Sequence, residues 1–151
     1  TTAMNKIIRI ILTSLLLLIG IQASAQEGLQ IASAFKIYGK QKGATLVELS
    51  NEVLETYEMK FYKSLSLKDA ESALPHIYKC LEADKQQAKK VKEVVVGGKI
   101  QSGYYQLPQI KEDVNRFILF KTGQKGSATL IYIVGELDAE DIVTLLFMKK
   151  D

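Results

Sequence analysis

The chain has 151 residues, of which 47% are hydrophobic and 25% are charged, and its 20 basic and 17 acidic side chains give a formal net charge of +3. This length and composition indicate one globular domain that can bury a core without cross-links. Cys80 is the only cysteine, which excludes a disulfide scaffold and a metal site built on cysteine pairs.

The N-terminal segment is organised like a cleavable secretory signal. Lys6 and Arg9 give it a basic start, and an apolar run follows at residues 10–21. Ala23-Ser24-Ala25 then places two small residues around one position, the pattern that signal peptidase reads. The apolar run is shorter than the roughly 20 residues of a membrane-spanning helix, and no charged stop-transfer cluster follows it.

We therefore expect residues 1–25 to be a signal peptide and residues 26–151 to form one mature domain, with a retained N-terminal anchor as the alternative. Residues 1–3 precede the expected initiator, Met4, and we interpret them as an added segment or a misplaced start. Removing the two basic residues of the signal leaves 18 basic against 17 acidic side chains, a net charge of about +1. The expected location is periplasmic or secreted, and membrane contact is expected only through the signal before cleavage.

The first half of the mature chain predicts two helices and two strands. Apolar residues recur at helical spacing over residues 29–38. Residues 44–50 and 59–67 alternate apolar and polar side chains over part of their length, which predicts strands. A short helix is expected between the strands, around residues 53–57.

The longest helix is predicted to open at Asp69, because apolar residues recur at helical spacing as far as Leu81. Pro75 deletes one backbone donor, so it should kink this helix or mark a restart. Asp84 with Gln87 has the spacing of a cap for a second helical segment.

Two hairpins are predicted next. Gly97-Gly98 is a two-residue turn between strands at 91–96 and 99–107, and turn residues also separate strands at 114–121 and 127–134. The second pair is apolar over continuous runs, as in central strands covered on both faces.

The last predicted element is a helix capped by Asp138, with Asp141 as its third residue and Leu137 packed on Ile142. Lys149 and Lys150 would lie at the negative end of its dipole. The order of elements predicts an α+β domain, a mostly antiparallel sheet built from hairpins with helices packed on it.

Several stretches of the chain resemble a family of small exported proteins from gut Bacteroidetes, known only as a domain of unknown function. They are the expected signal ending in Ala-Gln and the stretches FYKSLSL, GYYQLP, NRFILF and TLIYIVG. The resemblance covers nearly the whole mature chain and implies an envelope or secreted location. It implies no activity and no site residues.

Two constellations suggest nucleophilic catalysis. Ser33 and Lys36, together with residues 121–123, match the Ser-x-x-Lys and Lys-Thr-Gly elements of serine β-lactamases, but the third element is absent and the chain is too short for that fold. His76 and Cys80 lie four residues apart on the predicted long helix, with Asp84 one turn further on as a candidate orienting group. A thiol in the middle of a helix lacks the features that lower its pKa, so a buried thiol beside a half-exposed imidazole is our preferred interpretation.

Metal, cofactor and nucleic-acid sites are not expected. The acidic stretch 135–141 lacks the spacing of a calcium loop, and capping explains its acids. Gly97-Gly98-Lys99 lacks the spacing of a phosphate-binding loop. The densest basic stretch, residues 85–92, is bracketed by acids, and we interpret it as a solvated helix face rather than a nucleic-acid surface.

Tyr104 and Tyr105 are the candidate partner-binding residues. As neighbours in a strand they point to opposite faces of the sheet, so one can fill the core while the other meets a partner. The hairpin that carries them is expected at an edge of the sheet, where a partner strand can add.

We expect a non-enzymatic exported binding module of the bacterial envelope, with a protein, a peptide or a glycan as partner. A small hydrolase with a site at Cys80 and His76, or at Ser33 and Lys36, is the first alternative. A structural envelope component that acts by self-association is the second.

Overall fold

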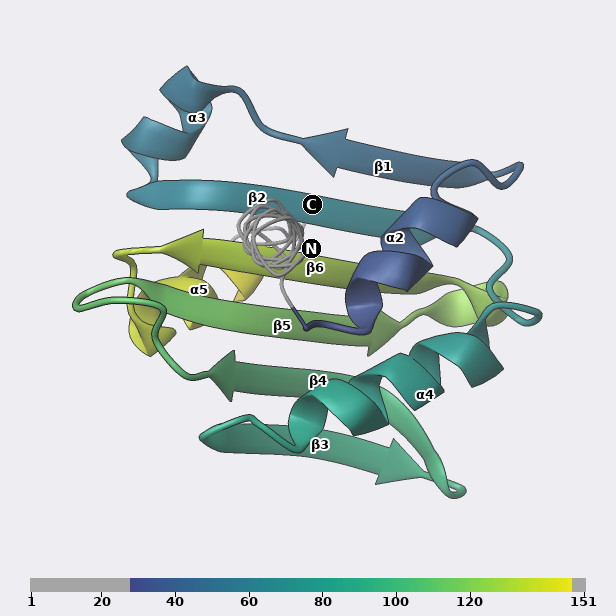
Figure 1. The fold of residues 1–151 in the computed structure, drawn as a ribbon. Coiled ribbons are helices and arrows are strands. Elements are labelled where there is room, and N and C mark those ends of the chain that lie inside the picture. Colours follow the sequence, from purple (N-terminus) through teal and green to yellow (C-terminus); the bar gives the residue numbers. More distant parts are fainter. Residues whose placement is uncertain (1–27, 148–151) are drawn as a thin grey trace, which may run out of the picture.

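The computed structural model describes residues 28–147. It contains a six-stranded antiparallel sheet in the order β1-β2-β6-β5-β4-β3, with four α-helices packed on it in a single domain (Figure 1). This confirms the predicted fold class. The predicted signal peptide, Lys149 and Lys150 lie outside the described residues.

The strands follow the predicted boundaries closely. They are β1 (Ala44–Glu48), β2 (Met59–Leu67), β3 (Lys90–Val96), β4 (Lys99–Leu107), β5 (Asn115–Thr122) and β6 (Ala128–Gly135). The turn between β3 and β4 has positive φ at both Gly97 and Gly98, the conformation that a two-residue hairpin needs and that glycine adopts without strain. The apolar strands β5 and β6 occupy the centre of the sheet, as their continuous hydrophobic runs predict.

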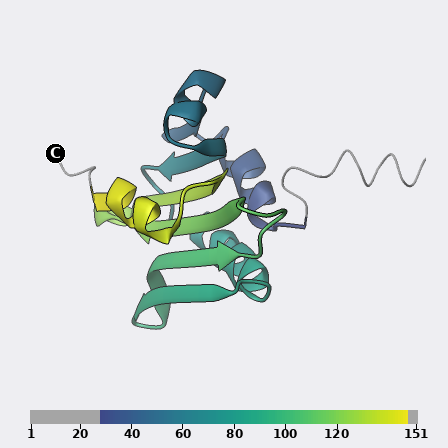
Figure 2. The same cartoon turned by 90° about the vertical axis from the view of Figure 1, so that its left-hand side faces the viewer.

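The helices cover the two faces unequally. Helices α2 (Ile31–Tyr38) and α4 (Leu74–Lys85) lie on one face, and α5 (Ala139–Phe147) lies on the other (Figure 2). The short helix α3 (Asn51–Thr56) joins β1 to β2 and buries Leu54 in the same cluster as Ile142 of α5. Each face of the sheet therefore has its own apolar core.

The larger core lies under α2 and α4. Its largest fully buried side chains include Phe35, Ile77, Tyr105 and Tyr132. The smaller core contains Phe117 and residues of α3, β2, β6 and the α5 region. Burying both faces of β5 and β6 explains why these strands carry almost no alternation of polar residues.

Helix α4 departs from its predicted start. It begins at Leu74 rather than at Asp69, and Pro75 lies in its first turn. A proline is tolerated there because the first backbone N–H groups of a helix have no partner within the helix. Pro75 therefore marks the beginning of α4 and does not kink it.

The basic stretch at residues 85–92 is not a helix face, contrary to the sequence interpretation. Helix α4 ends at Lys85, and Lys90 already belongs to β3. The prediction for the last helix is confirmed, because Asp138 and Asp141 each accept a hydrogen bond from the other's backbone N–H. Leu137 and Ile142 share the smaller core, as the staple at this helix start requires.

Candidate functional site

The edge strand β3 is the most exposed apolar element of the sheet. It pairs with β4, and no strand of the described residues pairs with its other side. Every residue of β3 except Glu93 is exposed, and Val94, Val95 and Val96 are 52%, 54% and 61% exposed. Natural edge strands usually carry charges or prolines that discourage pairing with another chain. Here the last three residues of the strand carry none.

Glu93 is the one acidic residue of β3, and its charge is directed inward. Its carboxylate accepts hydrogen bonds from Tyr105 Oη (2.5 Å) and Lys85 Nζ (3.2 Å). Hydrogen bonds to Glu82, one turn back, and to Glu93 raise the pKa of Lys85. The only acidic charge of β3 is therefore neutralised on the face covered by α4, and Lys90 and Lys92 are the exposed charges of the strand.

Gly103 makes this arrangement possible. Glu93 and Gly103 are cross-strand partners, and the ring of Tyr105 lies over Gly103 on the same face. A Cβ atom at Gly103 would lie 2.6 Å from Cε2 of Tyr105, which is too close for any side chain. Because Gly103 has no side chain, the Tyr105 ring can lie over it and its hydroxyl can reach Glu93.

The structure places the two candidate tyrosines on opposite faces. Tyr105 is buried in the larger core, and burial, the largest cause, together with the hydrogen bond to Glu93, raises its pKa. Tyr104 is half-buried beside Phe117 in the smaller core, with ring centroids 6.0 Å apart, and it is the cross-strand partner of Lys92. Its hydroxyl oxygen is buried with no hydrogen-bond partner among the described residues. Tyr104 is therefore the more accessible of the two.

The two catalytic candidates of the sequence converge at the α2–α4 interface. Ser33 Oγ lies 3.5 Å from His76 Nε2 and 3.7 Å from Cys80 Sγ, and Tyr38 Oη lies 3.0 Å from His76 Nδ1. Lys36 is one turn further along α2 and lines the same surface groove as Ser33, but no hydrogen bond joins these two side chains within residues 28–147. The serine therefore meets the histidine and the cysteine rather than the lysine that its motif suggested.

This cluster is poorly arranged for nucleophilic attack. The hydroxyl of Ser33 donates to the Gln30 carbonyl at 2.7 Å, a shorter contact than that to His76. Burial raises the pKa of Cys80, and the thiolate is the nucleophilic form of a cysteine. The contacts favour a packing role between two helices.

Asp84 has a role that the sequence did not predict. Its carboxylate accepts hydrogen bonds from the backbone N–H groups of Gln30 (2.7 Å) and Ile31 (2.9 Å), so it caps α2 from another helix. The predicted cap for a segment after Asp84 is wrong, because α4 continues through Asp84. Asp84 was only a candidate orienting group for His76, and its carboxylate binds the start of α2. Burial raises the pKa of Asp84, against the opposing effect of the two N–H groups.

The remaining motifs have structural roles. Thr122 of the Lys-Thr-Gly match donates its hydroxyl to the Gln101 carbonyl on β4. Asp138 and Asp141 of the acidic stretch form the cap of α5. Among residues 28–147, no three His, Cys, Asp or Glu side chains gather closely enough to hold a metal ion. No helix in this part of the chain has the length and apolarity needed to cross a bilayer.

The fold defines a small α+β domain, built on one antiparallel sheet with an exposed apolar edge. A family model described as "Family of unknown function (DUF6108)" matches residues 18–146, and the protein belongs to this family. No curated protein and no solved structure matches the chain.

Proposed function

We propose that the protein is an exported interaction module of the bacterial envelope that binds an extended segment of a partner protein along β3. The observation that carries this proposal is the surface of the edge strand, where three consecutive valines are exposed and the one acid is turned inward. Strand addition supplies backbone hydrogen bonds for affinity and side-chain contacts for specificity. A glycan has no peptide backbone to pair in this way, so the edge favours a protein partner.

The side chains of β3 indicate the chemistry of the partner segment. Val94 and Val96 lie on the face of the sheet away from α4, the face on which half-buried Tyr104 pairs with Lys92. Lys90 and Lys92 are exposed at the start of the strand. The complementary segment has β-branched or aromatic residues opposite the valines and an acidic residue opposite the lysines, because opposite charges on neighbouring strands attract.

The proposed location rests on the N-terminal sequence and on the family resemblance. A basic start, a short apolar run and Ala23-Ser24-Ala25 fit an exported protein. The resemblance to exported proteins of gut Bacteroidetes supports the same compartment. The intact mass of protein recovered from the envelope fraction tests this part, since export with cleavage removes residues 1–25.

A charge-introducing variant tests the β3 edge. Val94→Lys/Val96→Lys places two ammonium groups on the edge, and both positions are exposed, so the fold should tolerate the change within about 0.5 kcal/mol each. We expect this variant to lose the partner that the unaltered protein captures by cross-linking in its native envelope. The matched control is Val47→Lys/Val53→Lys, which makes the same change at two exposed valines on β1 and α3.

Binding must also be located on the strand. A peptide copied from the captured partner should slow hydrogen exchange at the backbone N–H groups of β3 when it binds the unaltered protein. Equal capture by the Val94/Val96 and Val47/Val53 variants would refute the proposal. Recovery of a second copy of this chain, lost in the Val94/Val96 variant alone, would replace the proposed partner with self-association.

A further inference from the structure

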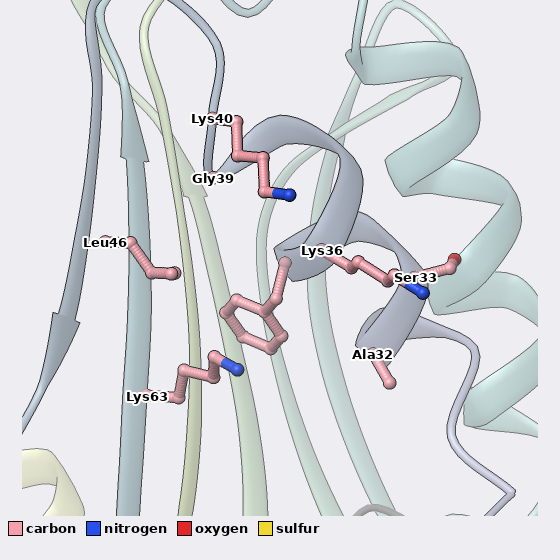
Figure 3. A pocket seen from close by; sticks show the side chains of 8 residues that line it. Ala32, Ser33, Lys36, Gly39, Lys40, Leu46 and Lys63 are labelled. Atoms are coloured by element: carbon pink, nitrogen blue, oxygen red, sulfur yellow. The ribbon is translucent and has the colours of Figure 1, made fainter.

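A groove lies between α2 and strands β1 and β2, near the edge of the sheet opposite to β3 (Figure 3). Its volume is about 470 Å³, within the range of roughly 300–1,000 Å³ that is typical of small-molecule sites. Its lining residues come from α2, the turn after it and the two strands. Among them are Phe35, Lys36, Gly39, Lys40, Leu46 and Lys63.

Part of the groove is apolar. Phe35 is buried at 2% exposure, whereas Leu46 on the outer strand β1 is 41% exposed. Gly39 follows α2, and a Cβ atom there would lie 3.2 Å from Leu46 Cδ2. The absence of a side chain at Gly39 therefore lets Leu46 approach α2, and Leu46 offers an accessible contact for an apolar group.

The charged side chains that line the groove are all basic. Lys36, Lys40 and Lys63 line it, and no acidic residue does. Lys63 pairs with Glu48 (3.2 Å) and lies 5.6 Å from the centroid of the Phe35 ring. Lys36 and Lys40 form no ion pair within residues 28–147, so the cluster has a net charge of about +2 after Glu48 is included.

Helix electrostatics alone does not explain this cluster. The dipole of α2 favours a cation in its last turn, which accounts for Lys36. It does not account for Lys63, whose side chain is 18% exposed and comes from β2. Lys40 lies in the turn after Gly39, beyond the end of α2, and adds a second exposed ammonium group that forms no ion pair within residues 28–147.

We propose that this groove binds a small organic acid, an anionic carboxylate or sulfonate attached to an apolar body. The acid group interacts with the ammonium groups of Lys36 and Lys40, and the apolar body packs on Leu46. This binding is separate from the proposed partner edge, because β1 and β3 are the two opposite edges of the sheet.

A matched pair of probes separates the contribution of charge from that of apolar contact. 3-Phenylpropionate carries a carboxylate, and 3-phenyl-1-propanol has a similar body without the charge. In an NMR titration of the purified protein, the acid should cause saturable shifts of the backbone amide signals of Gly39 and Leu46. We expect the alcohol to bind at least about fivefold more weakly, because exposed ion pairs contribute modestly each.

The lysine variant provides the second test. Lys36→Gln/Lys40→Gln removes two exposed charges, and it should reduce the affinity for the acid to that for the alcohol. Lys99→Gln/Lys125→Gln is the matched control, since it makes the same change at two exposed lysines that do not line the groove. The inference is overturned if the groove amides show no saturable shifts, if acid and alcohol bind equally, or if the control weakens binding as much. The Val94→Lys/Val96→Lys variant should bind the acid normally, so this inference and the proposed function can fail independently.

Discussion

Replacing Asp84 tests whether a carboxylate from α4 holds the start of α2 in place. Asp84→Ala leaves the N–H groups of Gln30 and Ile31 without their acceptor, and the Ile31 bond is buried. A buried donor that loses its partner costs about 1–3 kcal/mol, and loss of a helix cap typically costs ~1 kcal/mol. Because removing a buried charge offsets part of this cost, we expect the free energy of unfolding to fall by about 2–3 kcal/mol.

Urea denaturation followed by circular dichroism measures this change. Asp69→Ala is the matched control, because Asp69 is exposed and its carboxylate accepts, within the described residues, only a long hydrogen bond from Glu71 N (3.3 Å). A loss in Asp84→Ala no larger than that in the control would refute the capping role.

The pH dependence of stability provides a further test of Asp84. Burial raises its pKa in the folded state, so the folded protein holds this proton more tightly than the unfolded chain does. The stabilising contribution of this proton is complete below the ordinary Asp pKa of about 4, and it is lost as the pH rises through the raised folded pKa. Relative to Asp84→Asn, which does not titrate, the unaltered protein should therefore lose stability as the pH rises above about 4. The opposite slope would show that the two N–H groups outweigh burial.

Two further predictions concern buried polar groups. Tyr104→Phe should leave the melting temperature unchanged or raise it, because the hydroxyl oxygen has no hydrogen-bond partner within the described residues. Tyr105→Phe should lower the free energy of unfolding by about 1–3 kcal/mol, because it removes the hydrogen bond to Glu93. A scanning-calorimetry comparison in which Tyr104→Phe is the more damaging change would contradict this assignment. The Cys80 thiol should react slowly with a bulky disulfide reagent in the folded protein and quickly in denaturant, since burial raises its pKa and blocks access. Rapid reaction of the native protein would restore the hypothesis that Cys80 is a nucleophile.

The sequence predicted the strands well because their signal is local. Alternation and turn chemistry placed β2 at residues 59–67 and the Gly97-Gly98 hairpin at its observed position. Continuous apolar runs correctly indicated that β5 and β6 are central. The start of α4 was misplaced, because residues 69–73 share its apolar spacing but precede the proline that begins the helix.

The contacts that define the candidate sites are long-range, and they left no local signal. Asp84 caps a helix whose first residue is 53 positions earlier in the chain, and Ser33 meets His76 and Cys80 across the same interface. Neighbouring residues had suggested other partners, a Lys one turn after Ser33 and a cap after Asp84. Only the packing of α2 on α4 decides between them.

The two edges of the sheet show how distant residues determine an exposed surface. On β1, the acid Glu48 remains 62% exposed while it pairs with Lys63, so a charge stays at that edge. On β3, Glu93 is only 15% exposed, because Lys85 and Tyr105 bind its carboxylate from the covered face. The apolar surface of β3 therefore depends on residues of α4 and β4 as much as on its valines. Lys90 and Lys92 charge only the start of β3, and its last three residues are exposed valines, so that end of the edge is the better candidate for a partner.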